Sequence, residues 1–282
     1  MSTPFVPPPL DPAAVAELGR RFRTLHDAGT FVMANVADTG TAAAVAGVGI
    51  EAIATTSSGH AMTIGRDDAA GEVSMEEHAE HTELLVRAVS VPCNVDAENG
   101  YGHEPEDMAA AVEHFAATGA AGMGIEDWSG DPSIGAYDRA KAIARIEAAV
   151  EAAEALDRPF TITGRTEVLL YGLDGGLAEA LARLQGMAEV GAHCLYAPGT
   201  WDLDTIRTVV DEAGGPVNVL LPLGRPSFVP AASPSLGYDE LAGAGVRRIS
   251  IGGSLYQAQV NFAADLMRRT LAGGVFATPV ME

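Results

Sequence analysis

Acidic side chains follow two neighbouring apolar segments of the chain, in a spacing that suits a metal site or acid–base chemistry. Asp96 and Glu98 follow Val91–Val95, and Glu126 and Asp127 close a second such segment. In a strand, residues two positions apart share one face, which places Asp96 beside Glu98. Clustered carboxylates need either raised pKa values or a bound cation. Oxygen donors without a nearby histidine or cysteine pair favour a hard ion, so we predict Mg²⁺, with Mn²⁺ as the alternative. Ordinary solvated loop acids are the competing interpretation.

A cation and several neutral polar groups occupy comparable positions. Arg165 follows the apolar segment Phe160–Thr163 in a chain that has 17 basic and 38 acidic side chains. A guanidinium at a strand end suits bidentate capture of a carboxylate or phosphonate, although a surface arginine would fit the same position. The other polar residues that come at or just after apolar segments are Asn35, Asp38, Ser58, Gly59 and Asn218.

The elements that position these residues alternate along nearly the whole chain. The expected strands are Thr30–Asn35, Ala52–Thr56, Val91–Val95, Ala121–Glu126, Phe160–Thr163, His193–Tyr196, Val217–Leu220 and Arg247–Ile251. Amphipathic helices separate them, among them Glu106–Thr118 and Asp138–Leu156, where apolar residues recur every three or four positions. Eight such units favour a parallel (β/α)₈ TIM barrel over an open doubly wound sheet, which is the alternative. Reactive groups then gather at the carboxyl ends of the strands.

The ends of the chain and its local signals complete the domain prediction. Residues 1–11 form a Pro-rich N-terminal tail, and residues 12–282 form a single barrel domain that opens with a helix over Pro12–Ala28. Ser74 and Glu77 have the spacing of a capping box and predict a helix start.

Composition excludes several classes of protein. The formal charge of −21 argues against a nucleic-acid-binding protein and against attachment to anionic membranes, because both need clustered basic residues. The 48% of apolar residues suffice for a large core, and no apolar run approaches the ~20 residues that a membrane-spanning helix needs. Cys93 and Cys194 lie far apart in apolar segments, so we expect reduced thiols in a cytoplasmic protein.

Two histidines are candidates for proton transfer, and two others are candidates for a ligand pair. His60 and His103 flank the expected mouth of the barrel, but a solvent-exposed histidine without a role is the interpretation that their surroundings favour. His78 and His81 have helical spacing among several glutamates, which favours a solvated helix face over a ligand pair.

Five segments resemble landmarks of the isocitrate lyase/phosphoenolpyruvate mutase superfamily. They are Asn35-Val-Ala-Asp38, Thr56-Ser-Ser-Gly59, Asp96-Ala-Glu-Asn-Gly-Tyr-Gly102, Gly124-Ile-Glu-Asp127 and Gly164-Arg-Thr-Glu167. The resemblance runs from about Phe31 to the last helix. It implies a (β/α)₈ barrel that binds Mg²⁺ and a small carboxylate substrate. It also implies a homo-oligomer, a dimer or a tetramer, in which the C-terminal helix is exchanged between subunits.

The resemblance also implies roles for individual residues. Asp96, Glu98 and Glu126 match the acids of the metal site, and Arg165 matches the substrate-binding arginine. Ser58 and Gly59 match the loop that holds the substrate carboxylate and enolate oxygen, and Asp68 is similar to an acid that reaches the metal through water. We therefore predict Arg165, Glu126, Ser58 and Asp68 as catalytic residues. Substrate binding is assigned to Ser58, Gly59, Asn35, Asp38, Arg165 and Asn218.

One segment departs from the family pattern. The lyases of isocitrate and methylisocitrate carry Lys-Lys-Cys-Gly-His after the fourth strand, and the phosphonate mutases use Lys and Asn there. This chain has Trp128–Tyr137, which contains no Cys, Lys or His, so it resembles a short-loop subgroup.

Three hypotheses about function follow from this pattern. The first is an Mg²⁺-dependent enzyme that cleaves a C–C bond beside a carboxylate in a small 2-oxo or 2-hydroxy (di)carboxylic acid through an enolate. Such an enzyme would be similar to an oxaloacetate decarboxylase or a methylisocitrate lyase. The second is P–C bond chemistry on phosphonopyruvate, as in phosphoenolpyruvate mutase or phosphonopyruvate hydrolase. The third is a barrel that binds oxo acids without turnover.

Overall fold

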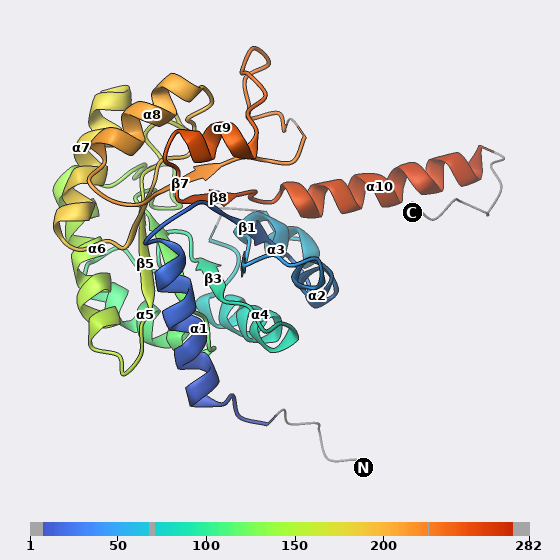
Figure 1. Cartoon of the computed structure of the whole chain (residues 1–282), viewed down its shortest axis with the longest axis horizontal. Coiled ribbons are helices and arrows are strands. Elements are labelled where there is room, and N and C mark those ends of the chain that lie inside the picture. The colour runs from blue at the N-terminus through green and yellow to red at the C-terminus, as the bar shows by residue number, and fades with distance from the viewer. Residues whose placement is uncertain (1–7, 68–70, 225, 273–282) are drawn as a thin grey trace.

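The strands of the computed structural model, which describes residues 8–67, 71–224 and 226–272, close into a parallel barrel (Figure 1). They follow one another in chain order, and β8 pairs with β1 to complete the ring. The strands are β1 (Phe31–Asn35), β2 (Ala52–Ala54), β3 (Cys93–Asp96), β4 (Gly122–Glu126), β5 (Thr161–Arg165), β6 (Cys194–Tyr196), β7 (Val217–Leu220) and β8 (Arg248–Ser250). The predicted TIM barrel is confirmed.

Helices surround the barrel and connect successive strands. They are α1 (Pro12–Leu25), α2 (Thr39–Gly47), α3 (Ser57–Thr63), α4 (Met75–Ala88), α5 (Asp107–Ala117), α6 (Arg139–Glu154), α7 (Gly176–Glu189), α8 (Leu203–Glu212), α9 (Tyr238–Gly243) and α10 (Ser254–Leu271). The predicted capping box is present at the start of α4, where Ser74 and Glu77 cap each other's backbone. The division into a tail of residues 1–11 and a barrel domain remains a prediction, because residues 1–7 lie outside the described part.

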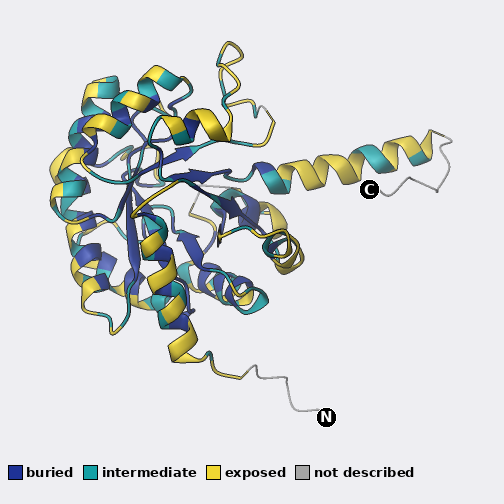
Figure 2. Cartoon of the chain, viewed as in Figure 1, coloured by how far each residue is buried: buried dark blue, intermediate teal, exposed yellow. Residues whose placement is uncertain are grey.

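Successive side chains of β4 point alternately to the outside and to the inside of the barrel. Met123 and Ile125 are fully buried in the apolar layer between strands and helices, where they share a cluster with Phe115 of α5. Figure 2 shows that most of the barrel strands are buried. Gly124 and Glu126 face the interior instead. One strand therefore supplies both the outer core and an acid to the mouth of the barrel.

The last helix, α10, projects away from the barrel (Figure 1). Within α10, Ser254 is buried, whereas Val260, Phe262, Met267 and Leu271 are exposed to solvent. Within the described residues, no helix combines the length and apolarity that crossing a membrane requires.

Candidate active site at the mouth of the barrel

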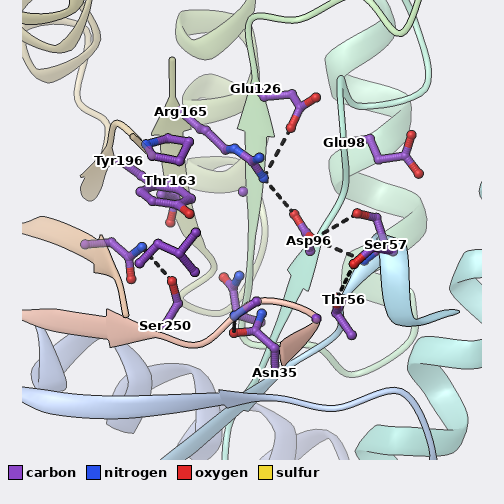
Figure 3. Close-up of a pocket in the computed structure, with 18 of the residues that line it drawn as sticks. Asn35, Thr56, Ser57, Asp96, Glu98, Glu126, Thr163, Arg165, Tyr196 and Ser250 are labelled. Atoms are coloured by element: carbon purple, nitrogen blue, oxygen red, sulfur yellow. Dashed lines mark hydrogen bonds and ion pairs between the residues drawn. The ribbon is translucent and has the colours of Figure 1, made fainter. Parts of the chain in front are cut away.

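A cavity of about 460 Å³ opens among the carboxyl ends of the strands (Figure 3). Its charged lining residues are Asp96, Glu98, Glu126, Arg165 and Arg248. Its polar lining includes Asn35, Thr56, Ser57, Ser58, Asn94, Thr163, Tyr196, Asn218 and Ser250. The structure therefore brings together most of the residues that the sequence singled out at strand ends.

Arg165 is the centre of the charged side of this cavity. Its Nη1 atom lies 3.2 Å from Asp96 Oδ1 and 3.2 Å from Glu126 Oε2 (Figure 3). Its Nε atom donates to Glu167. Glu126 and Arg165 are register partners on adjacent strands, so pairing of β4 with β5 sets their contact. The Arg165 guanidinium also lies 5.2 Å from the centre of the Tyr196 ring. Carboxylates from three strand ends or loops thus share one cation.

Burial shifts the pKa values of the charged groups in this cluster. Burial raises the pKa of Glu126 well above its ordinary value, the charge of Arg165 opposes that shift, and neighbouring carboxylates reinforce it. The pKa of Glu167 is raised too, again first by burial. Burial disfavours the charged form of Arg165, but the adjacent Glu126 and Glu167 nevertheless raise its pKa. The acids therefore have a surplus of negative charge that a further cation would relieve.

The donor atoms at this position fit a hard divalent ion in kind. Asp96 and Glu126 each direct an oxygen at the same Arg165 nitrogen, and Glu98 lines the same cavity. Figure 3 shows the Glu98 carboxylate directed away from Asp96. Among the described residues, no three His, Cys, Asp or Glu side chains are already gathered closely enough to hold a metal ion. The predicted metal residues are thus neighbours around one cavity, with oxygen ligands of the type that Mg²⁺ prefers.

The start of α3 supplies hydroxyl groups beside Asp96. The backbone N–H and the hydroxyl of Ser57 both donate to Asp96 Oδ2, each at 3.1 Å. Ser58 lines the cavity, as predicted for a substrate contact, and its Oγ lies 3.2 Å from Thr56 Oγ1. Sequence analysis missed Ser57, although its position directly before Ser58 and after a strand was a usable signal.

Gly59 has a packing role in this structure. Its N–H donates to Thr56 Oγ1, which caps α3. A Cβ at Gly59 would lie 2.5 Å from Thr56 Cγ2 and 3.0 Å from Ala37 Cβ. The absence of a side chain therefore lets the first turn of α3 pack against the loop after β1.

Two predicted amides line the opposite side of the cavity. Asn35 Oδ1 accepts from the backbone N–H groups of Ile251 and Gly252, both at 3.0 Å, which ties β1 to the loop after β8. Asn218 Nδ2 donates to Ser250 Oγ at 2.9 Å. Both amides thus hold neighbouring strand ends in place while facing the cavity.

Two acids expected at the mouth lie elsewhere. Asp38 caps α2 by accepting from the backbone N–H and the hydroxyl of Thr41, and it does not belong to the cavity lining. Asp127 is 1% exposed and accepts from Thr166 Oγ1 at 2.7 Å and Arg183 Nη1 at 2.9 Å. The expectation that Asp127 joins the acids of the mouth was wrong, since adjacent strand residues face opposite sides. Asp68, the third acid in question, lies outside the described residues.

The histidines also differ from expectation. His60 is 6% exposed, and its ring stacks on that of His81 with centroids 3.9 Å apart. His78 is 1% exposed, with Nδ1 2.6 Å from the Tyr101 hydroxyl and Nε2 3.1 Å from Thr55 Oγ1. The prediction of solvent-exposed histidines was therefore wrong for His60 and His78.

This buried imidazole supports the loop that carries the acids. Thr55 Oγ1 accepts from the backbone N–H of Asp96 at 2.8 Å, so His78 links that strand end to Tyr101. Glu98 and Tyr101 both have positive φ angles, +48° and +60°. The loop after β3 is thus held in an uncommon backbone conformation by contacts with β2 and α4.

The segment that departs from the family pattern reaches the rim of the cavity. Trp128 forms an antiparallel bridge with Ala136, and its ring lies 4.5 Å from that of Tyr171, centroid to centroid. Tyr171 lines the cavity. The short loop therefore packs beside the mouth through an aromatic contact.

Comparison with protein families gives a match to the phosphoenolpyruvate phosphomutase model over residues 22–271. The chain belongs to the phosphoenolpyruvate mutase/isocitrate lyase superfamily. A crystal structure of a putative lyase/mutase from Burkholderia cenocepacia J2315 is 37% identical to this superfamily member. That comparison covers 95% of this chain and 94% of the other, with a TM-score of 0.86.

Relatives with named activities are more distant and differ from one another. Oxaloacetate decarboxylase of Paraburkholderia xenovorans (strain LB400) is 30% identical over 55% of this chain and 50% of its own length. 2-Methylisocitrate lyase of Escherichia coli (strain K12) is 32% identical over 45% of this chain and 44% of its own length. Phosphonopyruvate hydrolase of Variovorax sp. (strain Pal2) is 31% identical over 60% of this chain and 58% of its own length. The matches thus span only about half the length of these relatives.

Proposed function

We propose that this chain is an Mg²⁺-dependent enzyme that cleaves a C–C bond beside a carboxylate in a small 2-oxo or 2-hydroxy acid. The observation that carries the proposal is the contact of Arg165 with Asp96 and Glu126 at the mouth of the barrel. It puts a guanidinium, a group that suits a carboxylate, and carboxylate oxygens, which suit a metal ion, in one cavity. C–C cleavage beside a carbonyl produces an enolate, whose negative charge such a site stabilises.

The residues of the chain would divide this work. Asp96, Glu98 and Glu126 would hold Mg²⁺, which when bound draws electron density from a substrate oxygen. Arg165 would bind the substrate carboxylate through its planar fork of donors. Ser57 and Ser58, at the start of α3, offer hydroxyl donors to substrate oxygens in the same cavity. These groups hold the substrate and stabilise the charge that develops when the bond breaks.

Proton transfer in this site needs a different type of group from histidine or cysteine. Among the described residues, the cavity lining has no His, Cys or Lys side chain. Tyr196, whose pKa burial raises, keeps its proton at neutral pH and lines the cavity beside Arg165. The proton in question would thus pass through a hydroxyl, a carboxyl group or water.

The relatives support C–C cleavage and also favour a second candidate. Oxaloacetate decarboxylase and 2-methylisocitrate lyase support the first proposal. The similarity to phosphonopyruvate hydrolase favours P–C cleavage of phosphonopyruvate as the alternative. A structure of a phosphonopyruvate hydrolase, 23% identical to this chain, holds oxalate and Mg²⁺. That complex is consistent with the metal proposed here.

A screen of substrates would test the two candidates directly. Purified protein is incubated with Mg²⁺ and C₃ to C₆ oxo or hydroxy acids, including oxaloacetate, methylisocitrate and phosphonopyruvate. Pyruvate formation from an acid without phosphorus, such as oxaloacetate or methylisocitrate, supports the first proposal. Phosphate release from phosphonopyruvate supports the second. Magnesium-dependent ligand binding without turnover of any compound would instead support an oxo-acid-binding barrel. EDTA-treated protein is the control for dependence on the metal.

We further propose that the chain forms a homo-oligomer, a dimer or a tetramer, through α10. The helix projects from its own barrel (Figure 1). It exposes Val260, Phe262 and Met267, which a second copy would cover. Such exposed apolar surface is typical of an interface.

A further inference from the structure

Arg248 is a buried cation at the inner end of the same cavity. It is 2% exposed, it comes from β8, and it lines the cavity together with Arg165. Its Nη2 atom donates to Thr163 Oγ1 at 3.0 Å, and Thr163 precedes Arg165 by two positions on β5. Arg248 thus lies one layer of inward-facing side chains deeper in the barrel than the site of Arg165.

The hydrogen-bond acceptors that surround Arg248 are neutral. Besides Thr163, its Nε donates to Asn218 Oδ1 at 2.9 Å, and its Nη1 lies 3.3 Å from His26 Nε2. The Phe22 carbonyl accepts from His26 Nδ1 at 2.8 Å, which leaves Nε2 as the acceptor for Arg248. Burial, and then the charge of Arg248, lower the pKa of His26 to about 3, so this histidine is neutral.

Arg248 therefore differs from Arg165 in its charge balance. Arg165 contacts three carboxylates, whereas the ion pairs of the described residues include no partner for Arg248. A guanidinium has five N–H bonds, and the three neutral acceptors use three of them. A buried charge without a counter-ion is costly, and an anion that enters the cavity relieves that cost.

The two ends of the cavity thus favour different parts of a ligand. Asp96, Glu98 and Glu126 line one side, which suits a metal and the reacting carbonyl or hydroxyl group. The other side has Arg248 with the neutral Thr163 and Asn218. With a divalent cation bound, the two arginines and the ion (+4) exceed the three carboxylates of the lining (−3), so the cavity suits an anionic ligand, and Arg248 offers a second anionic group a cation of its own, away from the metal.

We propose that Arg248 determines specificity by binding a second anionic group of the substrate, a carboxylate or a phosphonate, while the metal and Arg165 hold the first. This inference rests on the proposed function and narrows it to dianionic acids. It predicts discrimination against monocarboxylates that share the same 2-hydroxy or 2-oxo head group.

Matched ligands would test the role of Arg248. Isothermal titration with saturating Mg²⁺ compares lactate, malate and 3-phosphonolactate, which share a 2-hydroxy acid head and differ in the second anionic group. The wild type should bind malate or phosphonolactate at least about tenfold more tightly than lactate. The ligand with the larger preference identifies the second group as carboxylate or phosphonate.

Variants would then assign the preference to this side chain. Arg248→Met should abolish the preference for malate or phosphonolactate over lactate and leave the affinity for lactate within about twofold. The control is Arg23→Met, which removes a half-buried arginine that donates to the Phe160 carbonyl, and it should retain the preference. A preference that persists in Arg248→Met, or an equal loss of lactate binding, overturns the proposal. If Arg248→Met does not fold, Arg248→Lys provides the test, because a point charge without the fork should reduce the preference at least about threefold.

The same titrations distinguish this inference from the proposed function. Lactate that binds the wild type as tightly as malate and phosphonolactate contradicts only the role of Arg248. If none of the three ligands binds in the presence of Mg²⁺, the proposed function fails and the role of Arg248 fails with it.

Discussion

The Nη1 atom of Arg165 lies 3.2 Å from Oε2 of Glu126, across the pair of neighbouring strands β4 and β5. The same nitrogen contacts Asp96, and Glu167 accepts from Nε. Glu126 and Glu167 are both buried, and this one guanidinium is the cation that contacts each of them. It therefore supports the fold as well as the proposed chemistry.

Replacement of Arg165 should affect activity and stability together. Arg165→Met removes the proposed carboxylate-binding group, and we expect kcat to fall by about 10²-fold or more in the assay that the substrate screen identifies. It also leaves buried carboxylates without their cation, which should lower the free energy of unfolding at pH 7 by about 3 kcal/mol. Urea denaturation measures the second effect. Wild-type activity in this variant would contradict the site assignment.

Asp127 should matter for stability and not for metal binding. Its buried contacts with Arg183 and Thr166 lie behind β4, so Asp127→Asn should lower the free energy of unfolding by about 3 kcal/mol. The exposed Asp204→Asn, which weakens a surface pair with Arg207, should cost less than about 0.5 kcal/mol.

Binding of Mg²⁺ provides the complementary measurement on the same proteins. Titration calorimetry should give an unchanged affinity in the Asp127→Asn protein and a loss of binding in Asp96→Asn. An Asp127→Asn protein of wild-type stability that has lost Mg²⁺ binding would show that our division of these acids is wrong.

The buried His78 predicts a pH dependence of stability. Burial, reinforced by His60 and His81, lowers the pKa of His78 to about 3, whereas an unfolded histidine titrates near 6.5. Between these values the unfolded state binds a proton that the folded state does not, so stability falls as the pH drops. His78→Gln should reduce this slope by up to about 1.4 kcal/mol per pH unit. Urea denaturation at pH 7 and pH 5.5 measures it, and an unchanged slope in the variant would contradict the assignment.

The exposed face of α10 predicts the state of assembly. If a second copy covers Phe262, then Phe262→Glu should shift the protein from oligomer to monomer in size-exclusion chromatography with light scattering. Asn261→Glu adds the same charge at the neighbouring exposed position and should leave the mass unchanged. A wild-type protein that is already monomeric at micromolar concentration would refute the proposed role of this helix.

Sequence was most informative where a short-range pattern determines structure. Apolar segments separated by helical periodicity predicted the eight strands, and the bounds differ from the observed ones by at most a few residues. The helix over Pro12–Ala28 ends earlier, at Leu25, and Gly29 then adopts a positive φ of +77°. Such ends depend on local capping contacts that composition describes poorly.

The errors at the site arose from side-chain direction. Glu126 and Asp127 are adjacent, so strand alternation already required them to face opposite sides, and the pattern was available in the sequence. His78 is in helical register with the buried Thr82 and Leu85, and this signal was outweighed by the surrounding glutamates. The pairing of Arg165 with several carboxylates, in contrast, depends on contacts between strands far apart in the chain.

Glu98 and Tyr101 adopt left-handed backbone angles within one short turn, where glycine would be the less strained choice. Each such residue raises the energy of the native state by about 1 kcal/mol or more. Glycine at either position would relieve the backbone strain. Glu98→Gly would, however, lose a carboxylate that lines the cavity, and Tyr101→Gly would lose the hydroxyl that contacts His78. The turn after β3 is thus a place where the chain tolerates a less favourable conformation in order to keep two particular side chains.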